Sequence, residues 1–410
     1  MAELTILDVQ LYGQSIGTLT RLPGDRNLFA FNDSYIEDQN RPTLSLSFKD
    51  AFGALITEVR PIQTRLPPFF SNLLPEGAMR DYLAQKAKVN PAREFYLLWV
   101  LGQDLPGALK ISPLDGDQLP KDVGEEDEGS TTKTKDNEDG VLRFSLAGVQ
   151  LKFSAVKQAA GGFTIPVKGI GGSWIVKLPS TAHRGLPENE FAMMELARRV
   201  GIDVPETQLV PLAKIKGLPA GVDTAGNQAF VIKRFDRPDT GGAVHIEDFA
   251  QVFGLYPEAK YGKASYRNIA SVIWIETGET GIAEFLRRFA FNALIGNGDM
   301  HAKNWSLIYL DRRTPQLAPA YDFVSTIGYI PNDTLGLTFV DSKSFQSLTH
   351  EQFLRFAAKT GLPKKLTIDT VNDTVVRFRE VWRHSNDLPI DATLQQRIDQ
   401  HLLTLPIWTA

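Results

Sequence analysis

The acidic segment KDVGEEDEGSTTKTKDNEDG, residues 121–140, is the part of the sequence that most limits how this chain can fold. Its one aliphatic side chain is Val123, and it holds eight carboxylates against three lysines. Such a segment cannot bury enough apolar surface to offset the entropy lost on ordering it. We therefore interpret residues 121–140 as a solvated loop or linker, with an acidic binding tail as the alternative, and expect the core to form from the sequence on either side.

The chain as a whole has the composition of a globular protein. Of its 410 residues, 43% are hydrophobic and 10% aromatic, which is enough for a sizeable core. Apolar runs such as 95–102 are far shorter than the roughly 18 residues of a membrane span, and the first residues lack the basic start of a secretion signal. The chain has no cysteine, so disulfides and thiolate metal sites are excluded. We expect a cytoplasmic protein that makes no membrane contact.

The net charge says little about partners. It is -4 in total, and the acidic segment contributes -5, which leaves +1 on the remaining residues. We find no helix-turn-helix pattern and no concentrated stripe of lysine and arginine, so the sequence predicts no direct reading of DNA.

Hydrophobic periodicity predicts both strands and helices. Residues 4–22 and 43–50 alternate between apolar and polar side chains, which predicts a small antiparallel sheet near the N-terminus. Helical spacing follows in residues 71–89 and 92–102. Beyond the acidic segment, the patterns predict strands at 141–156, 172–179, 228–237 and 305–310, and helices at 188–201 and 281–296. The sequence is therefore typical of an α+β protein.

The loop NGDMHAKN, residues 297–304, carries an Asp, a His, a Lys and two Asn between an apolar helix and an apolar strand. Phosphoryl transfer from ATP requires a carboxylate that accepts the proton of the attacking hydroxyl, oxygen ligands for Mg²⁺, and a cation on the phosphates. Asp299 and Asn304 have the D-x-x-x-x-N spacing of a protein-kinase catalytic loop, and Asp322 precedes a Phe where an Asp-Phe-Gly metal ligand would stand. The pattern predicts Asp299 as the base, and Asn304 and Asp322 as metal ligands.

The cation is expected upstream, on a strand. Lys177 in WIVKLP fits the strand lysine of kinases that contacts the α- and β-phosphates. Glu190, at the start of the next predicted helix, is a candidate ion-pair partner, although an exposed Glu in the first turn of a helix is explained equally well by the helix dipole. Gly148, in SLAGVQLK, stands where a loop that covers the phosphates belongs.

Each of these residues also has a purely structural interpretation. Asp299 could be a turn residue and His301 a surface histidine, while Lys177 could be solvated and Asp322 a capping group. The order of the parts along the chain favours a kinase-type site over these interpretations. A metal hydrolase built on His301 is disfavoured because the chain has no H-E-x-x-H and its six histidines do not cluster. No G-x-S-x-G supports a serine hydrolase.

These motifs resemble those of a known family, the HipA-like serine/threonine kinases, which are toxins of bacterial type II toxin-antitoxin modules. The resemblance extends over nearly the whole chain, in blocks such as FFSNLLPEG, RFSLAGVQLKFS, ENEFAMMELARRVGI, LIGNGDMHAKNWS and PAYDFVST. It implies a protein-kinase-like, two-lobed α+β fold in which small antiparallel sheets precede an all-helical C-terminal subdomain. We place the N-terminal subdomain at 1–120, the linker at 121–140, the ATP-facing strands at 141–240 and the helical lobe at 241–410.

The resemblance also implies roles for individual residues, with ATP and Mg²⁺ as cofactors. Asp299 matches the catalytic aspartate, Asn304 and Asp322 match the metal ligands, and Lys177 matches the nucleotide lysine. The implied phosphate loop comprises Ala147, Gly148, Val149, Gln150, Leu151 and Lys152, the adenine segment Lys233, Arg234 and Phe235, and the other positions lining the nucleotide site His301 and Tyr321. Family members often carry Glu where Lys233 stands, so only a backbone role in adenine binding is carried over there.

Ser145 matches a serine that such kinases phosphorylate on themselves. A dianion just before the phosphate loop would repel ATP phosphates and displace the loop, so the resemblance implies self-inactivation. Without it, Ser145 reads as an ordinary strand serine. The acidic insert at 121–140 is longer than the family pattern leads us to expect.

The resemblance implies partners as well. The protein substrate would be a translation factor such as an aminoacyl-tRNA synthetase, and a small HipB-like helix-turn-helix antitoxin would neutralise the kinase and link it to operator DNA. Two alternatives stay open at this point. One is a catalytically silent binding module that acts with a DNA-bound repressor, and the other is a small-molecule kinase.

Overall fold

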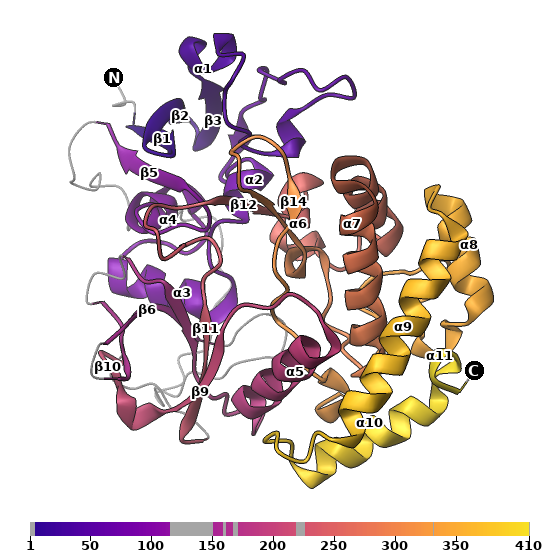
Figure 1. Cartoon of the computed structure of the whole chain (residues 1–410). Coiled ribbons are helices and arrows are strands. Elements are labelled where there is room, and N and C mark those ends of the chain that lie inside the picture. The colour runs from indigo at the N-terminus through magenta and orange to yellow at the C-terminus, as the bar shows by residue number, and fades with distance from the viewer. Residues whose placement is uncertain are drawn as a thin grey trace.

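The computed structural model describes residues 5–114, 151–158, 161–166, 171–218, 226–330 and 332–409. Three sheets and a group of C-terminal helices follow one another along the chain (Figure 1). Part of what the sequence singled out lies outside the described residues, namely the acidic segment 121–140, Ser145, Ala147, Gly148, Val149 and Gln150.

The first sheet confirms the antiparallel sheet predicted near the N-terminus. Its strands follow the order β4 (Ile62–Gln63), β3 (Arg26–Phe31), β2 (Gln14–Leu22), β1 (Thr5–Leu11) and β5 (Leu109–Pro113). Leu7, Val9 and Leu11 alternate along β1 and are fully buried, as one face of a half-buried strand must be. The helices of this region are α1 (Asp33–Glu37), α2 (Pro68–Ser71), α3 (Gly77–Ala87) and α4 (Glu94–Leu101).

The prediction of a strand at residues 43–50 is wrong. These residues contain a short 3-10 helix, η1 (Leu46–Phe48). The buried carboxylate of Glu247 accepts hydrogen bonds from the backbone N–H of Leu46, at 3.0 Å, and from the hydroxyl of Ser45, at 2.5 Å. The backbone donor is therefore satisfied by a carboxylate from a distant part of the chain, which local alternation cannot reveal.

The second sheet contains Lys177. Its order is β10 (Ile215–Lys216), β7 (Phe163–Thr164), β6 (Lys152–Lys157), β8 (Trp174–Lys177), β11 (Gln228–Lys233) and β9 (Thr207–Pro211). Lys177 lies opposite Lys152 on one neighbouring strand and opposite Phe230 on the other. Helix α5 (Leu186–Val200) follows β8 along the chain and buries Met193 and Met194, which confirms the predicted helix at 188–201.

The lobe at 241–410, expected to be all-helical, also contains a three-stranded sheet, which includes the strand predicted at 305–310. That sheet has the order β12 (His245–Asp248), β13 (Ser306–Tyr309) and β14 (Gln316–Leu317). The helices are α6 (Phe249–Val252), α7 (Tyr266–Leu294), α8 (His350–Thr360), α9 (Lys364–Arg383), α10 (Ala392–Thr404) and α11 (Pro406–Thr409).

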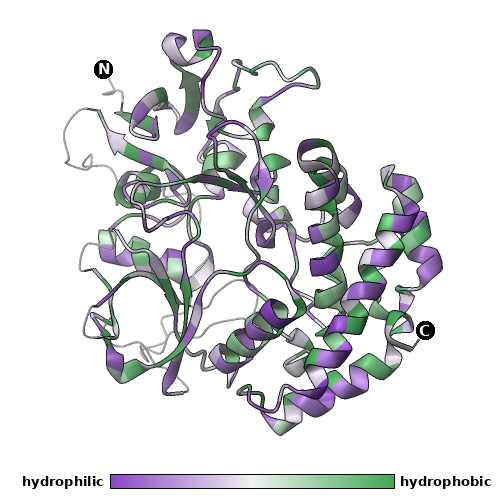
Figure 2. Ribbon diagram, in the orientation of Figure 1, coloured by the Kyte–Doolittle hydropathy of each residue, from purple (hydrophilic) through white to green (hydrophobic). Residues whose placement is uncertain are grey.

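Helix α7 is longer than the helix predicted at 281–296. A capping box at Ser265 starts it, and Gly278 interrupts it with a non-helical backbone (φ 65°, ψ -151°). The second half, from Gly281, is almost wholly buried in the largest core cluster, which also includes side chains of α5, α8 and α9. In Figure 2, α9 and α10 each carry both hydrophobic (green) and hydrophilic (purple) residues, as expected of helices with one face on a core. No helix of the described ranges is both long enough and apolar enough to cross a bilayer.

Candidate active site

The polar residues of the 297–304 loop hold its backbone in shape. Asn297 donates from its side chain to Asn292 Oδ1 at 2.8 Å and accepts the backbone N–H of Asp299 at 3.0 Å. Asn304 Nδ2 donates to the backbone carbonyl of Asp299 at 2.7 Å. Two amide side chains thus fix the backbone on both sides of Asp299 where a buried helix gives way to a buried strand. Many polar side chains gather in this loop because buried backbone groups require partners.

Asp299 is half-buried, and its carboxylate accepts a hydrogen bond from the hydroxyl of Tyr261. Burial raises the pKa of Asp299 to about 6, and the hydrogen bond from Tyr261 works against that rise. Nε2 of His301 lies 4.0 Å from Asp299 Oδ1. Burial, together with the nearby Lys260, lowers the pKa of His301 to about 3, so this imidazole is neutral at pH 7. The site therefore holds a carboxylate whose pKa lies close to neutrality beside an uncharged histidine.

Lys177 is buried, with 8% of its surface exposed, and therefore is not the solvated strand lysine of the structural interpretation. Its Nζ lies 2.5 Å from Glu190 Oε1 and also contacts Asp322 Oδ1. Burial opposes the charge on Lys177, but the two carboxylates outweigh it and raise the pKa of the amine. At Asp322, the contact with Lys177 outweighs the effect of burial and lowers the pKa of the carboxyl to about 2.

Glu190 is not the exposed first-turn residue that the helix-dipole interpretation requires. It is 1% exposed and lies one turn inside α5, facing Lys177. Burial raises the pKa of Glu190 to about 7, although Lys177 acts in the opposite direction. The pairing that the sequence could only suggest is therefore present in the structure.

Asp322 has a left-handed backbone, with φ of 58°. This region is costly for residues with a side chain, and such conformations concentrate at functional sites. The next residue, Phe323, is 1% exposed and packs against the ring of Phe291 in α7 at 5.3 Å. The core thus holds Asp322 in the strained conformation that turns its carboxylate toward Lys177.

Asn304 and Asp322 have the donor chemistry that Mg²⁺ prefers. The amide nitrogen of Asn304 donates to the carbonyl of Asp299. The amide oxygen of Asn304 accepts no hydrogen bond from any of the described residues, so it is available to a ligand. An amide oxygen and a carboxylate fit the sparse protein ligation of Mg²⁺ sites that share the ion with phosphates and water. No group of three or more His, Cys, Asp or Glu side chains in the described ranges could hold a metal.

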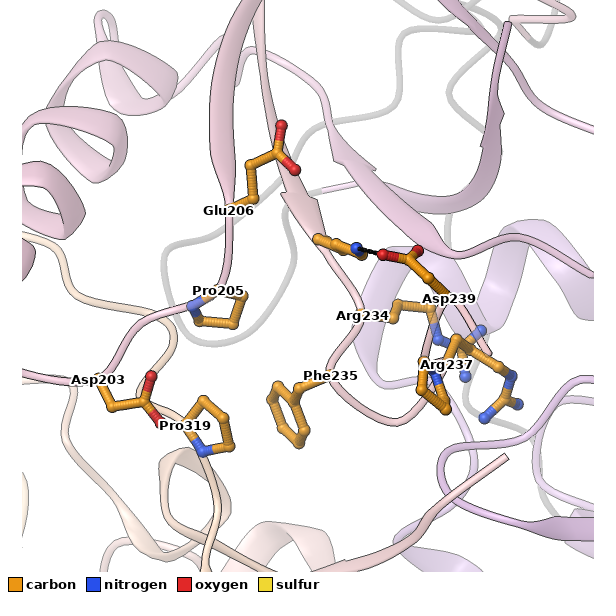
Figure 3. Close-up of a pocket in the computed structure, with 10 residues that line it drawn as sticks. Asp203, Pro205, Glu206, Arg234, Phe235, Arg237, Asp239 and Pro319 are labelled. Atoms are coloured by element: carbon orange, nitrogen blue, oxygen red, sulfur yellow. Dashed lines mark hydrogen bonds and ion pairs between the residues drawn. The ribbon is translucent and has the colours of Figure 1, made fainter. Parts of the chain in front are cut away.

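A pocket of 280 Å³ adjoins the end of β11. Figure 3 shows it, and its lining comprises Asp203, Pro205, Glu206, Lys233, Arg234, Phe235, Arg237, Pro238, Asp239 and Pro319. Residues 233–235, for which the family resemblance implies a role in adenine binding, thus form one wall. The ring of Phe235 lies 5.8 Å from that of Tyr321, the neighbour of Asp322. The Lys233 side chain pairs with Asp239 at 2.5 Å.

The structure brings most of the described candidate residues together. Lys177 and Asp322 are in contact, Asp299 is close to His301 and bonded to Asn304, and Phe235 approaches Tyr321. The carbonyl of Leu151 accepts the N–H of Leu178, the residue directly after β8, at 2.9 Å. Arg234 is an exception, because its side chain is taken up by Asp104 and Asp236.

Sequence reasoning missed a second group beside the 297–304 loop. The carboxylate of Glu76 lies 2.7 Å from Nζ of Lys303 and 2.8 Å from Nζ of Lys260. Burial favours the neutral acid, but the two ammonium groups outweigh it and lower the pKa of Glu76 to about 2. Lys303 stands inside the motif, whereas nothing local in the sequence signals that Glu76 or Tyr261 lies nearby.

The fold and the site define the class of this protein as α+β with a kinase-like architecture. The sequence-family model of the HipA N-terminal domain matches residues 7–112, and the family model of the HipA-like C-terminal domain matches residues 144–382. Together with the relatives described below, these matches show that the chain belongs to the HipA family.

Relatives cover the whole chain. It is 56% identical to Y4dM of Sinorhizobium fredii, a candidate kinase by name, over 100% of this chain and 99% of that protein. It is 27% identical to the serine/threonine-protein kinase toxin HipA of Shewanella oneidensis, over 74% of this chain and 73% of that one. A chain in the structure of the Shewanella oneidensis HipA, HipB and operator DNA complex has the same fold, with a TM-score of 0.73, 22% identity, and 98% of this chain and 96% of that chain covered.

Proposed function

We propose that this chain is an ATP-dependent serine/threonine protein kinase, and that Asp299, Lys177, Asn304 and Asp322 carry the reaction. The observation that carries this proposal is the position of Lys177. Its amine, on β8, contacts a glutamate from α5 and the aspartate that follows the hairpin β13–β14. Phosphoryl transfer relies on such positioning and electrostatic stabilisation, because the protein has little covalent chemistry to perform.

In this mechanism Asp299 accepts the proton of the attacking hydroxyl while that oxygen bonds to the γ-phosphorus and the bond to the β-phosphate oxygen breaks. Its pKa of about 6 leaves it mostly ionised at pH 7 and still basic enough to hold a proton. Asn304 and Asp322 would hold Mg²⁺, which neutralises charge on the phosphates when bound. Lys177 would bind the α- and β-phosphates, and the pocket beside residues 233–235 would receive the adenine end.

We infer further that Ser145 is the site of autophosphorylation. It precedes the implied phosphate loop, residues 147–152, of which Lys152 lies directly opposite Lys177 across the β6–β8 pair. A phosphoryl group on Ser145 would place a dianion beside the phosphate site and repel ATP there. Self-inactivation is the expected result.

The partners follow from the family. The Shewanella oneidensis protein of the same fold was solved with HipB and operator DNA, which supports a HipB-like antitoxin as the partner of this chain. Any contact with operator DNA would then run mainly through that antitoxin. A translation factor such as an aminoacyl-tRNA synthetase is the proposed protein substrate, on the family resemblance alone.

Intact-mass spectrometry with site mapping tests the proposal. Wild type and Asp299→Gln are incubated with Mg-ATP, alongside Asp369→Asn as a control that removes an exposed carboxylate on α9. We expect one phosphoryl group on Ser145 in wild type and in the control, and none in Asp299→Gln, because a base contributes about 10² to 10⁴-fold.

Three results would count against the proposal. Equal phosphorylation of Asp299→Gln would remove Asp299 from the mechanism. No added mass on an unmodified wild type that binds ATP, together with no transfer to any protein, would favour the silent binding module. Phosphoryl transfer to a small molecule alone would favour a small-molecule kinase.

A further inference from the structure

The segment that follows β11 is clamped by four charged side chains. Arg234 Nη1 lies 3.0 Å from Asp104 Oδ1, and its Nη2 lies 2.9 Å from Asp236 Oδ2. Arg237 repeats the pattern, with Nη1 at 2.9 Å from Asp236 Oδ2 and Nη2 at 3.4 Å from Asp104 Oδ1. Two arginines thus share two aspartates, and three of the four residues come from the segment itself.

The network is electrically balanced and mostly shielded from solvent, with the side chain of Arg237 the most exposed at 19%. The side chains of Arg234, Asp104 and Asp236 are 8%, 11% and 5% exposed. Buried charges of this kind are tolerated only when paired, and removing one partner leaves the others without compensation. The arrangement therefore fixes the position of the arginines far more tightly than exposed ion pairs would.

Asp104 is the member that comes from elsewhere. It lies between α4 and β5, in a turn that meets the segment at several further points. The N–H of Gly107 donates to Asp236 Oδ2 at 2.8 Å, and the Gly107 carbonyl accepts from Arg237 at 2.7 Å. The carbonyl of Leu105 accepts a hydrogen bond from Nη2 of Arg237 at 2.9 Å. Gly107 has φ of +76°, and a Cβ there would lie 2.8 Å from Nδ1 of His245, so the turn fits without room for a side chain.

The clamped segment is the wall of the pocket proposed for adenine. Phe235, between the two arginines, lies 5.8 Å from Tyr321, and Figure 3 shows Arg234 and Arg237 beside it. Among the described residues, no group hydrogen-bonds to the backbone N–H or carbonyl of Phe235, which leaves a donor and an acceptor for a ligand. Their positions depend on how firmly residues 234–237 are held.

We propose that Asp104 is a positioning residue for nucleotide binding. Through Arg234 and Arg237, the turn 104–107 of the N-terminal region holds residues 234–237 in the geometry that receives the adenosine part of ATP. Asp104 does this without touching the nucleotide. The inference rests on the proposed kinase function, and it makes the N-terminal region part of the nucleotide site.

Titration calorimetry with two probes tests this inference on the full chain in the presence of Mg²⁺. The probes are ATP, which has an adenosine part, and inorganic tripolyphosphate, which lacks it. We expect Asp104→Asn to weaken ATP binding by about tenfold and to leave tripolyphosphate binding within about twofold, since a buried pair loses its charge on one side. Lys177→Ala should weaken the binding of both probes. Asp387→Asn, which removes an exposed ion pair with Arg199, should change neither.

Further variants and outcomes keep the test decisive. Asp104→Glu retains the charge, so it should fold and recover part of the ATP affinity, and this variant decides the matter if Asp104→Asn fails to fold. Unchanged ATP affinity in both variants would overturn the inference. An equal loss for ATP and tripolyphosphate would assign Asp104 a general structural role and would overturn it too. A wild type that does not bind ATP would instead contradict the proposed function.

Discussion

At the scale of single residues, Asp299 combines two opposed requirements. A general base must be ionised to accept a proton, whereas burial of this carboxyl favours the protonated form and raises its pKa to about 6. The hydroxyl of Tyr261 stabilises the ionised form by donating a hydrogen bond to it. Tyr261 thus tunes the candidate base, although no local sequence pattern links the two residues.

This pairing predicts a pH dependence. Because the base is active when ionised, phosphoryl transfer should rise with pH through about 6 and fall about tenfold for each pH unit below it. Removing the Tyr261 hydroxyl takes away a contact that lowers the pKa, so Tyr261→Phe should move the midpoint to higher pH. The measurement is the rate of autophosphorylation against pH for both proteins.

The control for this prediction is Tyr256→Phe, which removes a hydroxyl bonded to the Leu66 carbonyl rather than to Asp299. Its midpoint should match that of wild type. A midpoint that stays in place in Tyr261→Phe would show that the titration belongs to another group.

At the scale of elements, helix α5 connects the site to the core. Its inner face buries Met193, Met194 and Leu196, and one turn closer to its start the same helix places Glu190 beside Lys177. Gly201 ends the helix with φ of 95°, and its N–H bonds back to the carbonyl of Arg198 at 3.1 Å. This is the left-handed cap that glycine forms at lowest cost.

Gly201→Ala should therefore destabilise the protein. An alanine at this φ costs about 1–2 kcal/mol, and its Cβ would lie 3.3 Å from Nη1 of Arg377. We expect the free energy of unfolding in urea to fall by that amount. Gly262→Ala is the matched control, because no atom lies within 4 Å of a Cβ there and φ is not positive. Equal losses in both variants would contradict the role of the cap.

At the scale of the whole molecule, buried polar contacts join the N-terminal region to the C-terminal part. Besides the Asp104 network, the carboxylate of Glu247 on β12 accepts hydrogen bonds from Ser45, Leu46 and Tyr309. Glu247 is 0% exposed, so water cannot take the place of its carboxylate as the acceptor for these donors. The segment at η1 and the C-terminal sheet are thus joined by polar groups that would lose their partners if the two separated.

Glu247→Ala should lower the free energy of unfolding by about 2–4 kcal/mol, since it strands buried donors. Glu247→Gln retains an acceptor oxygen and should cost less. Denaturant unfolding at neutral pH measures both variants. Equal stabilities of Glu247→Ala and wild type would mean that Glu247 does not couple the two regions.

Much of the architecture could be predicted from local patterns. Alternation in residues 4–22 indicated β1 and β2, the apolar spacing indicated α4, α5 and the second half of α7, and the order of Lys177, Asp299, Asn304 and Asp322 indicated a kinase-type site. The predictions of strands and helices succeeded because periodicity is a local property that burial acts on directly. The kinase-type site stays a prediction. The strand at 43–50 failed because its donors are satisfied by Glu247, some 200 residues away.

The sequence by itself determined the family, the α+β class and the residue types that phosphoryl transfer needs. Only the tertiary structure decided that Glu190 is buried against Lys177, that Tyr261 bonds to Asp299, that Glu76 pairs with Lys260 and Lys303, and that Asp104 reaches Arg234. Each of these contacts joins side chains from separate elements, and their energies come from burying paired charges and hydrogen bonds. Such pairing depends on where the elements pack, which no local stretch of sequence encodes.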